Sequence, residues 1–189
     1  MRNVLSEYGT DYAGAVIMGT SGKNPLARIA IPIATVIQWL KGGTYRSRFL
    51  KEAGFSGFND RFPDDPSENA WITGDKAQRD RYAADPLCSF TFTVSAYLDL
   101  YRMLTAVSSE KWARTLPKEL PILLISGADD PLGNYGEGIR QVYKWLESAG
   151  MRDVSMELVE KGLHEILNDF CRNTVLDSLY AFIGRNTAV

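Results

Sequence analysis

The apolar positions of the chain form two short uninterrupted runs, at residues 13–18 and at residues 121–126. The first run ends at a Gly-Thr-Ser-Gly sequence and the second ends at Gly127. Short apolar runs bounded by turn residues are typical of strands that are buried on both faces of a parallel sheet. Residues 154–159 predict a third strand.

Helical spacing of apolar residues follows each of the two later strands. It extends over residues 139–149, where Gly150 ends the pattern, and over residues 168–183. Alternating strands and helices are typical of an α/β layer with parallel strands and right-handed crossovers. Residues 2–8 indicate the end of a further helix, and Gly9 is expected to supply its left-handed cap.

Residues 23–120, between the first two strands, follow a different pattern, in which Gly and Pro repeatedly interrupt helical periodicity. Helices are predicted at residues 26–40, 45–53, 77–83 and 91–106, with an irregular connection at residues 55–66. The pattern indicates an inserted helical subdomain. We therefore expect a core made of residues 1–22 and 117–189, and a helical cap, or lid, made of residues 23–116.

Composition excludes several classes of protein. The chain has 21 Lys and Arg against 23 Asp and Glu, a formal net charge of -2 and no sustained basic run, so nucleic acid is not an expected partner. Its most apolar stretch, residues 29–40, is interrupted by polar residues and is shorter than a membrane span, so no integral membrane segment is expected. The first residues lack the apolar core of a secretory signal, which favours a cytoplasmic protein.

Metal and disulfide sites are not expected either. Cys88 and Cys171 lack metal-ligand spacing, and we expect both to be buried free thiols in a reducing compartment. The acidic residues between positions 60 and 85 do not follow the spacing of a calcium-binding loop, which favours a solvated surface.

The candidate chemistry lies after the second and third strands. His164 is the only histidine, and it follows the third strand, whereas Asp129 and Asp130 follow the second. Carboxyl ends of neighbouring parallel strands meet at one edge of a sheet, where ligands bind. A carboxylate beside an imidazole sets its tautomer and stabilises the imidazolium that forms when the ring takes a proton. The alternatives are an aspartate that only caps a turn and a histidine that is packed or exposed without a role.

A nucleophile for this pair is not found in the sequence. No Gly-x-Ser-x-Gly occurs among the 189 residues. Ser21 and Ser56 lie in the nearest approximations, but neither has the second glycine at the required place or the strand–turn–helix setting that exposes a nucleophilic serine.

The sequence resembles the α/β-hydrolase family, most closely its monoacylglycerol lipase, lysophospholipase and serine aminopeptidase-like branch. The matching segments are residues 14–22, residues 82–88 in the cap, residues 121–133 and residues 162–168. The resemblance covers essentially the whole chain, but only the later part of the family's fold. It implies a partial α/β-hydrolase parallel sheet with an inserted helical cap.

The resemblance also implies roles for particular residues. The family's acid lies three residues after the glycine that ends its strand, which is Asp130 here, with Asp129 the weaker candidate, and the family's histidine is His164. The nucleophilic serine and the oxyanion-hole donors would lie before Met1, the serine roughly half a dozen residues upstream. The chain as written is therefore expected to be inactive, and its first strand to leave an open sheet edge prone to self-association.

The expected function is that of the C-terminal part of a serine hydrolase that cleaves carboxylic esters, such as monoacylglycerol or lysophospholipid, without a cofactor. An acyl-chain pocket or ordinary packing would explain the apolar side chains of the cap, namely Trp39, Phe90, Phe92, Tyr97, Tyr101 and Met103. The alternative is a catalytically inactive hydrolase remnant or interaction protein. Amide cleavage would use the same acyl-transfer chemistry.

Overall fold

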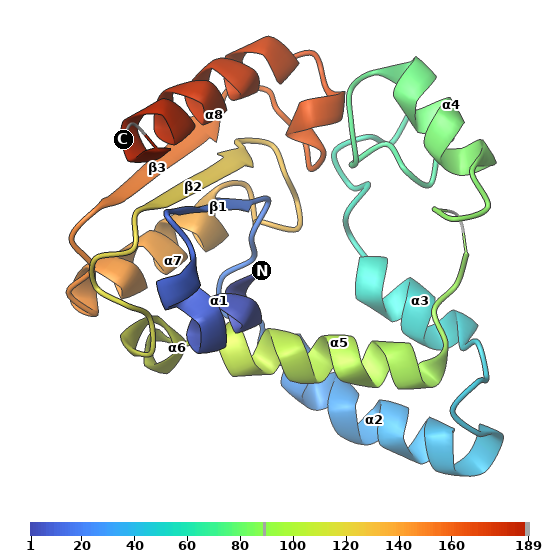
Figure 1. Cartoon of the computed structure of the whole chain (residues 1–189). Helices are drawn as coiled ribbons and strands as arrows, with labels where there is room; N and C mark the ends of the chain where they lie inside the picture. The colour runs from blue at the N-terminus through green and yellow to red at the C-terminus, as the bar shows by residue number, and fades with distance from the viewer. Residues whose placement is uncertain (89, 188–189) are drawn as a thin grey trace.

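The computed structural model describes residues 1–88 and 90–187. It contains a three-stranded parallel sheet in the order β1 (Ala15–Met18), β2 (Ile122–Gly127) and β3 (Val154–Val159) (Figure 1). The predicted α/β class and the three predicted strands are therefore confirmed, with end points that differ by at most two residues.

The central strand explains the long apolar run. β2 pairs with β1 on one side, with Ala15 opposite Ile122, and with β3 on the other, with Ile122 opposite Val154. All six residues of β2 are buried, because helices cover both faces of the sheet and strands cover both edges of β2. Among the described residues, no strand pairs with the outer edge of β1.

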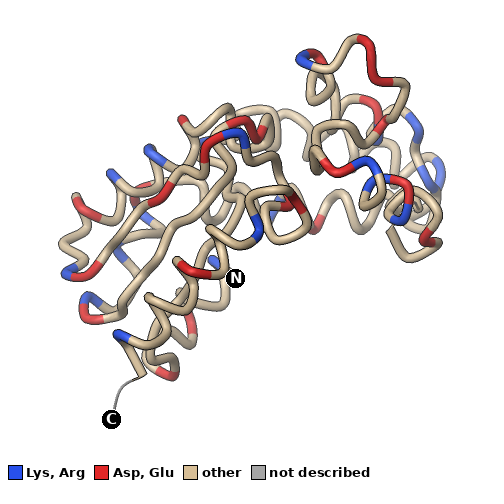
Figure 2. The backbone as a smooth tube through the Cα atoms, turned by 90° about the horizontal axis from the view of Figure 1, so that it is seen from above, with Lys and Arg blue, Asp and Glu red and all other residues tan. Residues whose placement is uncertain are grey.

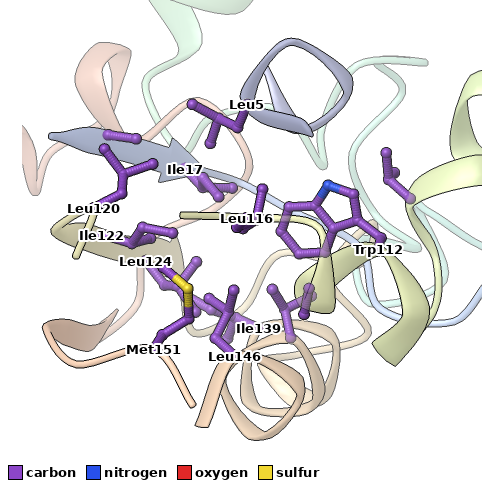
Figure 3. Close-up of a cluster of buried hydrophobic side chains, with 14 residues drawn as sticks. Leu5, Ile17, Trp112, Leu116, Leu120, Ile122, Leu124, Ile139, Leu146 and Met151 are labelled. Carbon is purple, nitrogen blue, oxygen red and sulfur yellow. The ribbon is translucent and has the colours of Figure 1, made fainter. Parts of the chain in front are cut away.

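The two faces of the sheet pack against different helices. α1 (Arg2–Tyr8), α6 (Glu110–Arg114) and α7 (Glu137–Ser148) cover one face. Leu5, Trp112 and Ile139 from these helices belong to the same buried hydrophobic cluster as Ile17 and Leu124 from the sheet (Figure 3). α8 (Arg172–Thr187) covers the other face through side chains that include Val175 and Phe182. Neighbouring residues of β2 alternate between these two clusters, as the pleat of a strand requires.

The remaining helices form a second cluster beside the sheet. α2 (Pro25–Lys41) and α5 (Val94–Val107) pack along each other, with α3 (Arg48–Phe55) against them and α4 (Lys76–Ala84) farther along the chain (Figure 1). All four helices were predicted, and capping side chains explain the shifted starts. Ser47 accepts a hydrogen bond from the backbone N–H of Leu50, and Thr93 accepts one from that of Ala96, so these two helices begin three residues later than the pattern predicted.

Two local predictions at the ends of helices are wrong. Gly9 has φ −58° rather than a left-handed conformation, and the chain continues from it into a 3₁₀ turn, Gly9–Asp11. A Cβ on Gly9 would lie 2.7 Å from Cδ of Pro117, so close packing explains why this residue is glycine. The last helix begins at Arg172 instead of residue 168, because a 3₁₀ turn, Ile166–Asn168, precedes it.

The environment predicted for the cysteines is partly wrong. Cys88 is exposed and Cys171 is half-buried, and both are free thiols. Leu87, next to Cys88, is also exposed, so the apolar residues around Cys88 belong to a surface segment and not to a core element.

The division into a core of residues 1–22 and 117–189 and a cap of residues 23–116 stays a prediction. Basic and acidic residues are interspersed along the backbone of both ranges (Figure 2). Within the described part of the chain, none of the helices has the length and apolar character that crossing a membrane requires.

Candidate active site

Asp130 and His164 meet at the carboxyl ends of β2 and β3. The Nδ1 atom of His164 lies 3.0 Å from Oδ2 of Asp130. Asp130 is fully buried, and the His164 side chain keeps 26% of its surface exposed. The predicted neighbourhood of the two loops is therefore what the structure has, and the accessible imidazole is backed by a carboxylate that water does not reach.

Gly127 allows the two loops to approach each other so closely. A Cβ on Gly127 would overlap the backbone carbonyl oxygens of Gly162 and Leu163. The loops are joined by a hydrogen bond of 3.0 Å from the backbone N–H of Asp129 to the carbonyl of Gly162. Only a residue without a side chain fits at the end of β2, so Gly127 both ends the strand and brings the two loops into contact.

The carboxylate of Asp130 has two separate partners. Its Oδ1 accepts a hydrogen bond of 2.9 Å from the backbone N–H of Leu132, while Oδ2 faces the imidazole of His164. Turn capping and contact with the histidine, which the sequence presented as alternatives, are thus combined in one side chain. The bond to Leu132 fixes the carboxylate plane and so aims Oδ2 at the ring.

Asp129 points elsewhere. Its carboxylate forms an ion pair of 3.2 Å with Arg61, whose guanidinium lies 3.4 Å above the ring centroid of Tyr135. Both charged side chains are about half exposed. The register counted from Gly127, which favoured Asp130 over Asp129 as the partner of His164, agrees with this geometry.

The ring of His164 lies close to both Trp71 and Gly19. The Trp71 ring centroid is 5.1 Å from that of the imidazole, and a Cβ on Gly19 would lie 3.2 Å from its Cε1. Gly19 has φ +58°, a conformation that side chains disfavour. Trp71 was not predicted from the sequence, because it is distant from His164 along the chain and no local pattern connects the two residues.

Arg2 holds the loop that follows β1, and it was also missed. Its buried guanidinium donates hydrogen bonds to Oγ1 of Thr20 at 3.2 Å, to the carbonyl of Ser21 at 3.0 Å, and to the carbonyl of Val107. It lies 4.1 Å above the ring of Trp112. Burial lowers the pKa of Arg2 to about 10. What marks Arg2 as a structural residue is its burial among backbone carbonyls and an indole ring. These contacts are visible only in the tertiary structure.

The arrangement is suited to proton transfer. When Nδ1 of His164 donates its hydrogen to Asp130, the lone pair of Nε2 is available to act as a base. Within the described residues Nε2 has no hydrogen-bond partner, and neither Ser21 nor Ser56 forms a hydrogen bond with the ring. The chain thus presents an acid–histidine pair, and neither of the two serines considered as nucleophiles is hydrogen-bonded to it.

The remaining reactive groups do not form a second centre. Over the described residues there is no group of three or more His, Cys, Asp or Glu side chains that could hold a metal ion. Partial burial raises the pKa of the Cys171 thiol, and Asp169 raises it further. This thiol therefore stays protonated at neutral pH and is a poor nucleophile.

Residues 1–170 match the family model described as serine aminopeptidase, S33. A carboxyl esterase from Bacillus coagulans, solved in complex with glycerol, superimposes on 99% of this chain with a TM-score of 0.91 and 27% sequence identity, and the chain covers 61% of that esterase. A comparison with proteins of curated function gives no match.

Two further structures share the fold. A lipase in an open form covers 97% of the chain at 24% identity with a TM-score of 0.80, and a soluble variant of monoglyceride lipase from Saccharomyces cerevisiae covers 100% at 17% identity with a TM-score of 0.63. The chain spans 60% and 59% of their lengths. The fold is therefore a partial α/β-hydrolase fold with a three-stranded parallel sheet, and the chain belongs to the serine aminopeptidase S33 family of α/β-hydrolases.

Proposed function

We propose that the chain is the C-terminal part of a serine hydrolase that cleaves carboxylic esters by acyl transfer. Asp130 orients the imidazole, and His164 is the general base and acid. The observation that carries the proposal is the contact of 3.0 Å between Nδ1 of His164 and Oδ2 of the fully buried Asp130. The nucleophilic serine and the oxyanion donors would come from a segment outside these 189 residues.

The proposed reaction has two stages. In the first, Nε2 of His164 takes the hydroxyl proton of the serine while the serine oxygen attacks the ester carbonyl carbon, and the same proton then passes to the departing alcohol. In the second, Nε2 takes a proton from water, whose oxygen attacks the acyl-serine, and returns it to the serine. Asp130 remains ionised throughout and stabilises the imidazolium.

Esters of glycerol are the proposed substrate class, such as monoacylglycerol or lysophospholipid. The support is the likeness to a carboxyl esterase solved with glycerol and to a monoglyceride lipase. Of the apolar cap side chains, Tyr97 and Tyr101 are buried in the helical cluster and serve packing, whereas Trp39, Phe90 and Met103 are exposed and are the better candidates for an acyl-chain surface. A cytoplasmic location is part of the same proposal.

A fluorophosphonate reagent, which labels activated serines, tests the function. We expect no labelling of the 189-residue chain, and labelling of the chain extended by the residues encoded before Met1. In the extended chain, His164→Ala should abolish labelling and Asp130→Asn should reduce it. An extended chain that folds but is not labelled would contradict the proposal. Matched ester and amide substrates then separate an esterase from an amidase.

The second candidate is an interaction protein derived from a hydrolase. It is favoured by the outer edge of β1, which has no partner strand among the described residues and can pair with another chain. Defined oligomers of the 189-residue chain, together with an unlabelled extended chain, would select this candidate.

A further inference from the structure

Asp169 is a buried carboxylate that holds two separate segments of backbone. Its Oδ2 accepts a hydrogen bond of 3.0 Å from the N–H of Leu163, next to His164. Its Oδ1 accepts bonds from the N–H groups of Gly74, at 3.0 Å, and Phe170, at 2.8 Å. Asp169 is only 7% exposed, and it forms no ion pair with the described residues. Its charge is therefore compensated by backbone donors.

The segment that Asp169 joins to the histidine loop also contacts His164 directly. The carbonyl of Trp71 accepts a hydrogen bond of 3.4 Å from the N–H of His164, and that of Ile72 accepts one of 2.8 Å from the N–H of Glu165. The hydroxyl of Thr73 donates to the carbonyl of Asn168 at 2.8 Å. Residues 71–74 thus run along the histidine loop, and the Trp71 ring lies on the imidazole.

We propose that Asp169 is a positioning residue for His164, because its carboxylate binds the backbone on both sides of the histidine site and keeps the ring between Trp71 and Asp130. The inference deepens the proposed function and rests on it, since a positioned imidazole matters when His164 transfers a proton. Two oxygens are required: an asparagine can keep its oxygen on Gly74 and Phe170, but its amide NH₂ would then face the N–H of Leu163.

The single histidine of the chain makes the test direct. In native protein, nitrogen–proton NMR of the imidazole should give one Nδ1–H signal, shifted strongly downfield by the bond to Asp130. Asp169→Asn should broaden this signal or shift it upfield while the helical circular dichroism is kept. Asp177→Asn is the matched control, because Asp177 is exposed on α8, and it should leave the signal unchanged. Asp130→Asn removes the carboxylate that accepts the Nδ1–H bond of His164, so its spectrum shows the largest change expected in this signal.

An unchanged Nδ1–H signal in folded Asp169→Asn would overturn the inference. If that variant does not fold, Thr73→Val decides. It keeps the side-chain shape but removes the hydroxyl bond to Asn168, together with the bond that the hydroxyl accepts from the N–H of Asp75. A weakened signal in Thr73→Val supports positioning through residues 71–74, and an unchanged one overturns it. In the extended chain Asp169→Asn should lower kcat on the order of 100-fold with little change in KM. The NMR result does not depend on catalysis, so failure of the proposed hydrolase function would be recognised separately.

Discussion

At the scale of single residues, the site depends on side chains whose atoms have different partners. Asp130 divides its two oxygens between Leu132 and His164, and the neighbouring Asp129 is turned away toward Arg61. Two adjacent and chemically identical residues therefore differ in burial and contact. This difference makes them a natural pair for mutagenesis.

We expect Asp130→Asn to lower kcat of the extended chain by about 10⁴-fold, because the amide favours the wrong imidazole tautomer, as in a serine protease triad. Loss of a buried hydrogen-bond partner should also lower the free energy of unfolding by about 1–3 kcal/mol. Asp129→Asn is the control and should change kcat less than a few-fold, since it removes only an exposed ion pair. Ester hydrolysis and denaturant titration measure the two effects; equal losses in both variants would contradict the assignment.

Gly19→Ala should disturb the imidazole. The new Cβ would lie 3.2 Å from Cε1 of His164, at a backbone φ of +58° that costs about 1–2 kcal/mol for alanine. Gly150→Ala has a similar backbone cost, with φ +80° and no atom within 4 Å of the new Cβ. Both variants should lose similar thermal stability, but only Gly19→Ala should shift the His164 ring signals in NMR. Identical histidine spectra would show that Gly19 has no steric role there.

At the scale of elements, capping residues and close contacts decide where helices begin and end. Periodicity predicted four cap helices at nearly their observed places, but the starts at Arg48 and Val94 follow the capping side chains of Ser47 and Thr93. α6 was missed because a helix of five residues is too short to show an apolar period. Its Trp112 nevertheless belongs to the main hydrophobic cluster.

α5 should make the helical cluster sensitive to alkaline pH. Burial raises the pKa values of Tyr97 and Tyr101, whose rings stack with centroids 6.0 Å apart. The neutral phenols therefore stabilise the fold below the ordinary tyrosine pKa of about 10, and this stability is lost as pH rises above it. Urea midpoints at pH 8 and pH 10.5 measure the loss. Tyr97→Phe should reduce the pH dependence, whereas Tyr180→Phe, at an exposed position, should not.

At the scale of the whole molecule, the outer edges of β1 and β3 both lack a partner strand among the described residues. Ala15 donates its N–H to the carbonyl of Pro121, just before β2, and Gly19 donates to that of Ile125 in β2. Strand alternation therefore directs the N–H groups of Val16 and Met18 toward the outer edge of β1. An edge of this kind can pair with a second copy of the chain. Because these N–H groups point outward, replacing one of them should block pairing at this edge.

Val16→Pro should reduce self-association of the 189-residue chain, because proline removes an outward N–H without removing a bond to β2. The molar mass measured by light scattering during size-exclusion chromatography should shift toward that of the monomer. Ile17→Pro, one residue along, removes a hydrogen bond within the sheet and should unfold the protein instead. A native chain that is already monomeric at all concentrations would contradict pairing through this edge.

The sequence by itself determined the three strands, the helices of the described residues other than α6, and the approach of Asp130 to His164. These features depend on local periodicity and on one general property of parallel sheets, that the loops after neighbouring strands lie together. The choice between Asp129 and Asp130 needed only a count from Gly127 within the resemblance. Periodicity and residue counts of this kind involve only residues that are close together in the chain, so they can be recognised from the sequence without the structure.

Only the tertiary structure decided what surrounds the pair. Trp71 on the imidazole, Arg61 on Asp129, Arg2 behind the loop after β1, and Asp169 between two backbone segments all join residues from different elements. In the first three contacts the partners are far apart in the sequence. Asp169 is close in sequence to Leu163 but far from its other partner, Gly74. Such contacts depend on how the helical cluster packs against the sheet, a sum of many weak interactions that no single sequence pattern records.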